Sequence, residues 1–255
     1  MMTIRNLMLA AVAAMSLSGA AQAAPDAPAY VKAAIADASR PAADVKLDAE
    51  RKPADMVVFA GIKPGDSVVD LMPGGGYFTR IFSKAVGPAG HVYAFQPTEQ
   101  EVFFKGKPAP VDAIAADPEY KNVRVITAPI MDFAIPAKVD VVWTSQNYHD
   151  LHNPLMGPAD MARFDKAVYD ALKPGGIFIV LDHAASAGTG TADTNTLHRI
   201  DSAAVKQEVE AAGFKFAGES DVLRNPDDDH TLIVFDPKIR RHTDQFVFRF
   251  EKPKM

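Results

Sequence analysis

The sequence predicts a three-layer α/β domain, with a doubly wound, mostly parallel sheet of seven strands and helices on both faces. Three observations lead to this prediction. Apolar runs alternate with helical stretches along the chain, and the runs are apolar throughout rather than at every second residue. Such runs are typical of strands in a parallel sheet that is covered on both faces. A glycine-rich turn, residues 73–76, joins the first of these strands to the helix after it.

The spacing of the apolar residues along the chain predicts which segments form strands and which form helices. The predicted strands cover residues 67–72, 91–96, 123–128, 139–144, 176–182, 214–217 and 245–250. The predicted helices cover residues 53–60, 77–86, 160–172 and 203–212. Gly61 follows the first of these helices, and Asp201 or Ser202 can cap the last, as expected at helix ends. Residues 231–235 fit either a strand or a short helix.

Composition narrows the possible classes of protein. The chain has 255 residues, of which 48% are hydrophobic, and this is enough for one sizeable core. Its formal net charge is -5 and its basic residues are scattered, which argues against a nucleic-acid partner because phosphate binding requires a basic face. The chain has no cysteine, so disulfides, thiolate metal ligands and a cysteine nucleophile are excluded.

The first residues have the pattern of an export signal. Arg5 precedes an apolar run over residues 7–17, and Ala21, Gln22 and Ala23 form a small-x-small cleavage site. The run is shorter than the ~20 residues that span a bilayer. We therefore predict a signal peptide over residues 1–23, a linker with a peripheral helix over residues 24–50 and the domain over residues 51–255. The mature protein would be periplasmic or secreted, without a membrane span.

The glycine-rich turn is the strongest local signal for a ligand. Glycines let the backbone approach a ligand closely, and the N-terminus of the following helix offers unpaired N–H groups to a carboxylate or a phosphate. A dinucleotide fingerprint of the form G-x-G-x-x-G/A would need glycine or alanine at position 79, but the residue is Thr79. The spacing therefore disfavours a nicotinamide or flavin cofactor.

The turn and the strand before it resemble the first motif of the class I S-adenosylmethionine-dependent methyltransferases, which have a Rossmann-like fold. In that family an acidic residue near the end of the first strand is followed by a D-x-G-x-G-x-G turn. Asp70 matches the acid, Gly74 and Gly76 match the second and third glycines, and Met72 replaces the first. The resemblance implies that S-adenosylmethionine binds at Asp70, Met72, Pro73, Gly74, Gly75 and Gly76.

A second match is the sequence L-K-P-G-G at residues 172–176, before a predicted strand. The resemblance spans roughly residues 52–214. The combination of P-G-G-G-Y-F-T-R, N-Y-H-D-L-H and T-D-Q-F is, more narrowly, similar to a group of predicted exported bacterial methyltransferases.

Two further positions are implied by the resemblance. The second strand of the family usually ends in an acidic residue that accepts hydrogen bonds from both ribose hydroxyls, and here that position is Gln96. Glutamine has one acceptor oxygen and no charge, so we expect weaker ribose binding, with Glu99 close enough in sequence to help. Asp132 matches the position that commonly binds the adenine amino group, and a loop or capping aspartate fits it equally well.

Several histidines follow the predicted fourth and fifth strands, at the sheet edge where the family places residues that face the methyl acceptor. We predict His149 as a general base, because a neutral imidazole can accept a proton from an acceptor. Hydrogen bonds to loop backbone are the alternative. A divalent metal could also bind here, among His149, His152, Asp182, His183 and perhaps His198. Their spacing matches no known ligand signature, so no metal site is predicted.

The residues and the resemblance together imply an enzyme that transfers a methyl group from S-adenosylmethionine to a small-molecule acceptor. An exported ligand-binding module that keeps the fold without catalysis is the alternative, since the cofactor is made in the cytoplasm and the ribose carboxylate is missing. A nicotinamide oxidoreductase is a weaker possibility because of the glycine spacing.

Overall fold

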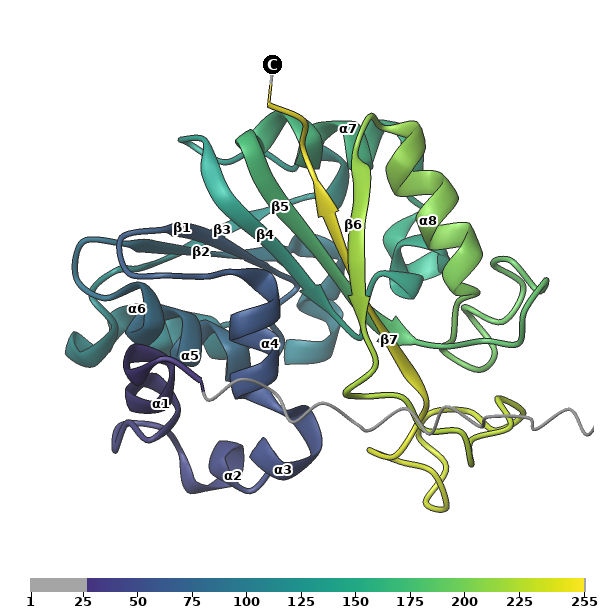
Figure 1. Cartoon of the computed structure of the whole chain (residues 1–255), viewed down its shortest axis with the longest axis horizontal. Coiled ribbons are helices and arrows are strands. Elements are labelled where there is room, and N and C mark those ends of the chain that lie inside the picture. Colours follow the sequence, from purple (N-terminus) through teal and green to yellow (C-terminus); the bar gives the residue numbers. More distant parts are fainter. Residues whose placement is uncertain (1–26, 255) are drawn as a thin grey trace, which may run out of the picture.

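The computed structural model describes residues 27–254, which form a seven-stranded sheet with helices on both faces (Figure 1). The strands are β1 (Ser67–Leu71), β2 (His91–Pro97), β3 (Val123–Ala128), β4 (Val139–Ser145), β5 (Leu172–His183), β6 (Lys215–Ser220) and β7 (Gln245–Glu251). Their order is β3-β2-β1-β4-β5-β7-β6. Strand β7 pairs antiparallel with both of its neighbours, β5 and β6, and the other pairings among these strands are parallel. The predicted doubly wound, mostly parallel sheet is confirmed.

The α-helices are α1 (Ala29–Ile35), α2 (Ala42–Val45), α3 (Asp48–Arg51), α4 (Pro53–Ala60), α5 (Tyr77–Val86), α6 (Pro110–Ala116), α7 (Met161–Ala171) and α8 (Ser202–Ala211). Short 3-10 helices are η1 (Thr98–Phe104), η2 (Pro118–Tyr120), η3 (Ile130–Asp132), η4 (His149–His152) and η5 (Pro154–Met156). Residues 231–235 form neither a strand nor a helix.

Two hydrophobic clusters, one on each face of the sheet, form the core. Val68 and Val141 belong to the cluster with α1, α4, α5 and α6. Their chain neighbours Val69 and Val142 belong to the cluster with α7 and α8. Successive side chains of a strand point to opposite faces, so a strand buried on both faces must be apolar at every position. This is the physical reason for the uniformly apolar runs in the sequence.

Helix ends follow the local chemistry of the sequence. The Asp160 side chain accepts a hydrogen bond from the Arg163 N–H at 3.1 Å and caps α7, and Asp201 caps α8 through the Ala203 N–H at 2.9 Å. Gly61 ends α4 with a φ of 71°, in the left-handed region. These contacts set where the helices lie relative to the strand ends.

Residues 27–51 are packed against the domain, although the sequence predicts a linker with one peripheral helix over residues 24–50. Three helices, α1 to α3, lie beside α4 and α5 (Figure 1). Val31 of α1 is fully buried in the core, and the Tyr77 hydroxyl of α5 donates to Asp48 Oδ1 of α3 at 2.6 Å. The segment is rich in alanine and has few large apolar residues, so its sequence alone does not indicate this packing.

The predicted signal peptide lies outside the described residues. Within residues 27–254, no helix combines the length and apolar character that crossing a membrane requires.

Candidate functional site

A cavity of about 350 Å³ lies at the carboxyl ends of β1 and β4. The chain runs from β1 to one side of the sheet and from β4 to the other, so this is the switch point where open α/β sheets bind ligands. Its walls come from the loop after β1, the loop after β4 and the α2–α3 segment. Five predicted cofactor residues line it together, namely Asp70, Met72, Pro73, Gly74 and Gly75. Gly76, Gln96 and Asp132 are not among its lining residues.

The turn after β1 has a strained backbone. Met72, at the position of the family's first glycine, has a φ of 52°, in the left-handed region that glycine adopts at little cost. The Asn147 Nδ2 donates to the Met72 carbonyl at 2.9 Å, so the loop after β4 holds this conformation in place. Gln146, next to Asn147, also has a positive φ of 61°. Strained residues of this kind concentrate at ligand sites.

Gly76 has a packing role in addition to its place in the turn. Its φ is 76°, and a Cβ atom there would lie 2.1 Å from Ile114 Cδ1 of α6. At Gly74 and Gly75, a Cβ atom would meet nothing within 4 Å. Of the three glycines, only Gly74 and Gly75 line the cavity and leave space for a ligand.

Asp70 is a buried acid at the base of the cavity. It is 3% exposed, and the Thr79 hydroxyl donates to its Oδ2 at 2.6 Å. Burial raises the pKa of Asp70 to about 7, although the Thr79 hydrogen bond and the Arg51 charge oppose the rise. The carboxyl is therefore about half ionised near neutral pH, and a cationic group beside it would favour the ionised form.

Arg51 brings a positive charge to the same cavity. Its guanidinium lies 4.7 Å from the centre of the Tyr77 ring and 5.9 Å from that of Phe78, and its Nη2 is 3.5 Å from Gln146 Oε1. No ion pair joins it to a carboxylate among residues 27–254. Burial lowers the pKa of Arg51. The sequence alone does not single out Arg51, because nothing local distinguishes it from the other scattered basic residues.

A second cavity, of about 310 Å³, adjoins the first. The two share Leu47, Arg51, Phe78, Ser145 and Gln146 as lining residues. The remaining wall comes from α3, the end of β5, the segment between β6 and β7 and the start of β7. It consists of Glu50, Leu181, His183, Leu223, Val234, Phe235, Arg240, Arg241 and Gln245. The site is therefore a pair of adjoining chambers with Arg51 and Gln146 between them.

Gln96, the penultimate residue of β2, has an unpaired hydrogen-bond acceptor close to the first cavity. It is 1% exposed, its Nε2 donates to Gln100 Oε1 at 2.8 Å, and its Oε1 has no hydrogen-bond partner in the described chain. Gln100 itself lines the cavity. Leaving a buried acceptor unpaired costs free energy that a ligand hydroxyl would recover. Glu99 is engaged elsewhere, because its carboxylate accepts the Ile130 N–H at 3.0 and 3.1 Å.

Asp132 lies on the surface at the end of η3. Its side chain is 65% exposed and forms a 3.8 Å ion pair with Arg163, which is 63% exposed. Nothing in this arrangement places it near the cavity, so an adenine contact at Asp132 remains a prediction from the resemblance alone.

His149 is buried in the segment that follows β4. Its Nδ1 lies 2.8 Å from Asp182 Oδ1, and its Nε2 lies 3.2 Å from His198 Nδ1 and 3.3 Å from Asp150 Oδ1. Burial alone would lower the pKa of His149, but the Asp182 and Asp150 carboxylates raise it to about 10. A ring that is protonated at neutral pH cannot accept a proton, so this geometry gives no support to the predicted base role.

The other predicted histidines separate into different contacts. His183 faces the second cavity and its Nδ1 lies 2.7 Å from Thr243 Oγ1. Burial lowers the pKa of His183 to about 4. His152 Nε2 lies 3.3 Å from Glu208 Oε2. Of the residues considered as metal ligands, His149 contacts Asp182 through Nδ1 and His198 through Nε2, and Asp150 joins His149 and His198 in a group of three possible ligand atoms.

Solved structures share this fold. No protein-family model and no curated protein matches the sequence. A S-adenosylmethionine-dependent methyltransferase from Aquifex aeolicus matches with a TM-score of 0.57 at 19% identity, over 82% of this chain and 95% of its own. The cyclase SpnF matches with a TM-score of 0.56 at 17% identity, over 80% of this chain and 82% of its own.

A third structure was solved with ligands bound. The 1,6-didemethyltoxoflavin-N1-methyltransferase from Burkholderia thailandensis, in complex with 1,6-didemethyltoxoflavin and S-adenosylhomocysteine, matches with a TM-score of 0.53 at 16% identity. The match covers 81% of this chain and 80% of that one. Together with the strand order, these similarities show that the chain has the Rossmann-like fold of the class I methyltransferases.

Proposed function

We propose that this protein transfers a methyl group from S-adenosylmethionine to a small-molecule acceptor. The observation that carries the proposal is the cavity at the switch point of the sheet, where the acidic and glycine positions of the family motif lie together with an arginine that has no carboxylate partner in the described chain. Structures with this fold include methyltransferases and one complex with S-adenosylhomocysteine, which supports the choice of cofactor.

The residues of the first cavity fit the functional groups of this cofactor. Asp70 would bind its cationic amino group, and Arg51 would bind its carboxylate. The backbone at Gly74 and Gly75 allows close approach. Gln96 does not line the cavity but donates to Gln100, which does, and its unpaired Oε1 can accept a hydrogen bond from a ribose hydroxyl that reaches it. When bound, the cofactor would supply a methyl group on a positively charged sulfur.

The second cavity is the place for the acceptor. It adjoins the first across Arg51 and Gln146 and has a volume suited to a small molecule. Arg240 and Arg241 also line it, which favours an acceptor that carries negative charge. The chain would accelerate transfer mainly by holding the two reactants in line. The proposal uses no proton transfer to His149.

Calorimetry with S-adenosylhomocysteine tests the proposal before an acceptor is known. Purified protein should bind this ligand and show no binding of NAD at the same concentration. The variant Arg51→Met, which keeps much of the side-chain volume and removes the charge, should weaken binding about tenfold or more, since hydrogen bonds between charged groups contribute ~1.5–3 kcal/mol. Lack of binding to the wild-type protein would refute the cofactor assignment.

A non-catalytic binding module is the second candidate. It is favoured by the absence of a carboxylate at Gln96, and the cyclase SpnF shows that this fold is not confined to proteins named as methyltransferases. The two candidates differ in turnover. Incubation with S-adenosylmethionine and a library of small anionic acceptors should yield S-adenosylhomocysteine if the protein is an enzyme, and binding without product across the library would favour the module.

We also infer that the protein is exported, on the basis of the pattern in residues 1–23. The mature chain should then begin at or near Ala24. N-terminal sequencing of the protein isolated from its native host tests this inference, and an intact N-terminus at Met1 or Met2 in the cytoplasmic fraction would contradict it.

A further inference from the structure

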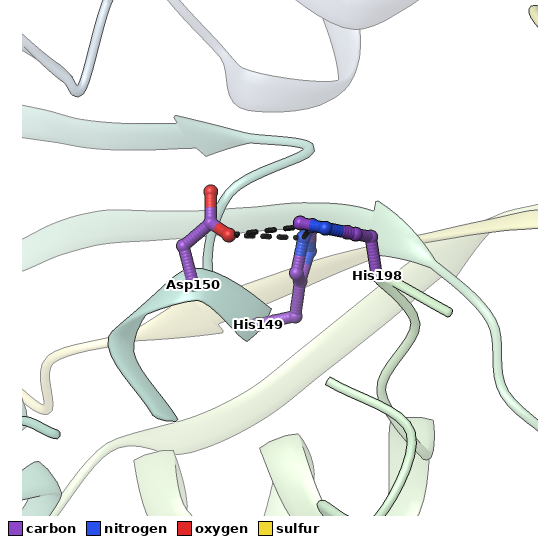
Figure 2. A group of neighbouring side chains, drawn as sticks. All are labelled: His149, Asp150 and His198. Carbon is purple, nitrogen blue, oxygen red and sulfur yellow. Dashed lines mark hydrogen bonds and ion pairs between the residues drawn. The ribbon is translucent and has the colours of Figure 1, made fainter. Parts of the chain in front are cut away.

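Three side chains converge at the segment that follows β4. His149 and Asp150 belong to η4, and His198 comes from the segment before α8. The His149 Nε2, the His198 Nδ1 and an Asp150 carboxylate oxygen point toward one another (Figure 2). Each of the three atoms is a good ligand for a divalent metal ion once its proton is removed.

The distances between these atoms match the edges of a tetrahedral site. The separations are 3.2 Å between the two nitrogens, 3.3 Å from His149 Nε2 to Asp150 Oδ1 and 3.6 Å from His198 Nδ1 to the same oxygen. Ligand atoms at ~2.05 Å from zinc in a tetrahedral arrangement are about 3.3 Å apart, whereas neighbouring ligands of an octahedral ion at ~2.1 Å are about 3.0 Å apart. We propose that His149, Asp150 and His198 bind a divalent transition-metal ion of the zinc type.

Asp182 orients the first ligand as metal sites require. Its Oδ1 accepts the His149 Nδ1–H at 2.8 Å and its Oδ2 accepts the His149 backbone N–H at 2.7 Å. Asp182 is fully buried, so this pair of contacts fixes the ring and leaves Nε2 as the free end. A carboxylate that holds the second nitrogen of a ligating histidine is a general feature of metal sites.

The three ligands leave room for a fourth. The Asp150 and His198 side chains are 25% and 28% exposed, while His149 is 3% exposed, so the open side of the cluster faces solvent. A catalytic zinc ion typically has three protein ligands and a water or substrate in the fourth position. The His198 ring lies 4.9 Å from that of Phe235, which lines the second cavity. A bound metal would therefore lie next to the proposed acceptor chamber.

The metal site does not depend on the proposed methyl transfer. Without a metal, the same three groups would form only a hydrogen-bond network, in which a proton lies between His149 Nε2 and its two neighbours. The two descriptions differ in a direct measurement, because only a metal site binds zinc or cobalt with saturation at one ion per chain.

Calorimetric titration of chelator-treated full-length protein with zinc tests the site. Wild-type protein should bind one zinc ion, and the cobalt(II) form should show the intense visible absorption of a tetrahedral ion. The partly exposed ligands allow substitutions that spare the core, so His198→Asn and Asp150→Asn should each weaken zinc binding by at least ~100-fold. Asp182→Asn should weaken it about 10–100-fold, because it acts through His149.

His230→Asn is the matched control. The His230 Nε2 also lies near a carboxylate, at 3.1 Å from Asp244 Oδ2, but it belongs to no three-ligand cluster in residues 27–254. This variant should bind zinc as the wild-type protein does. Absence of saturable zinc or cobalt binding to the wild type would overturn the proposal, as would unchanged affinity in both His198→Asn and Asp150→Asn. Neither result bears on S-adenosylhomocysteine binding, which is measured separately in metal-free protein.

Discussion

Asp70 is a residue whose charge should respond directly to a bound cofactor. Its pKa in the folded protein is raised from 3.8 to about 7 by burial, so part of the apo protein carries the acid form at neutral pH. A cationic group of the ligand favours the carboxylate. Affinity for S-adenosylhomocysteine should therefore rise with pH by up to about tenfold per unit below pH 7 and level off above it.

Calorimetry between about pH 5.5 and 8.5 measures this dependence, in the range set by the raised pKa. The variant Asp70→Asn should bind more weakly and lose the slope. Thr79→Val removes a hydrogen bond to the ionised form, so it should move the midpoint to higher pH. The stability of the folded protein has the opposite dependence on pH: since the folded pKa of Asp70 lies above the unfolded value, the contribution of Asp70 to stability decreases as pH rises from about 4 to 7. If the affinity of the wild-type protein for S-adenosylhomocysteine did not change with pH, the assignment of Asp70 would be contradicted.

Gln96 is a second residue with an effect that can be measured. The variant Gln96→Glu should tighten S-adenosylhomocysteine binding about tenfold, because a charged acceptor forms stronger hydrogen bonds with ribose hydroxyls than an amide does. The apo variant should melt at a lower temperature than the wild type, since the position is buried and burial of a carboxylate costs free energy. Equal affinity in the two proteins would show that Gln96 does not contact the ligand.

At the scale of elements, two adjacent glycines in the turn between β1 and α5 have different roles. Gly75 leaves space for a ligand, whereas Gly76 packs against α6. Gly75→Val places a side chain in open space at the cavity wall, so it should abolish S-adenosylhomocysteine binding with little change in stability. Gly76→Ala should instead destabilise the fold by about 1–3 kcal/mol, because its Cβ atom overlaps Ile114 of α6 and its φ is positive. Calorimetry and denaturant unfolding of both variants check this division. Normal binding by Gly75→Val would show that the turn is only a connector.

The helices α1 to α3 form a second element that shapes the site. Asp48 accepts hydrogen bonds from Arg40 Nη2 and from the Tyr77 hydroxyl, both at 2.6 Å, and so ties α3 to α5. Asp48→Asn should lower the free energy of unfolding by about 1.5–3 kcal/mol at pH 7, the range for hydrogen bonds to charged groups. It should also weaken S-adenosylhomocysteine binding, because Arg51 of α3 loses its fixed position.

An exposed ion pair supplies the control for Asp48. Lys166 and Asp170 are each more than half exposed, so Asp170→Asn should change stability by less than about 1 kcal/mol. Burial opposes the lowering of the Asp48 pKa, but the hydrogen bonds from Arg40 and Tyr77 prevail and the folded value lies below 3.8. The stabilisation by Asp48 is therefore present above about pH 4 and is lost as pH falls through its folded pKa. Similar unfolding of the two variants would contradict the anchoring role.

At the scale of the whole molecule, the order of the strands decides where the ligand site lies. The loops after β1 and β4 are about 75 residues apart in sequence, and they meet because these strands pair in parallel. Their contact through Asn147 and Met72 supports the strained turn and closes one wall of the cavity. A ligand at this edge would therefore contact several elements at once, and its binding should protect the whole carboxyl edge of the sheet.

The sequence by itself determined the layers and most of the elements of this protein, because those depend on local properties. Strands buried on both faces must be apolar throughout, helix ends require residues such as Asp160 and Gly61, and a close turn requires glycine. These constraints act within a few residues, so they can be recognised in the amino-acid sequence. The same holds for the acidic and glycine positions at Asp70 and Gly74.

Only the tertiary structure decided which polar residues share a site. Arg51 enters the cavity because α3 packs on α5, Asp132 lies on the surface, and His149 faces Asp182, Asp150 and His198 rather than an acceptor. Burial and neighbouring charge then set the protonation of His149 and Asp70. These properties depend on contacts between segments distant in sequence, and electrostatic interactions act through space, so no local pattern of residues could have revealed them.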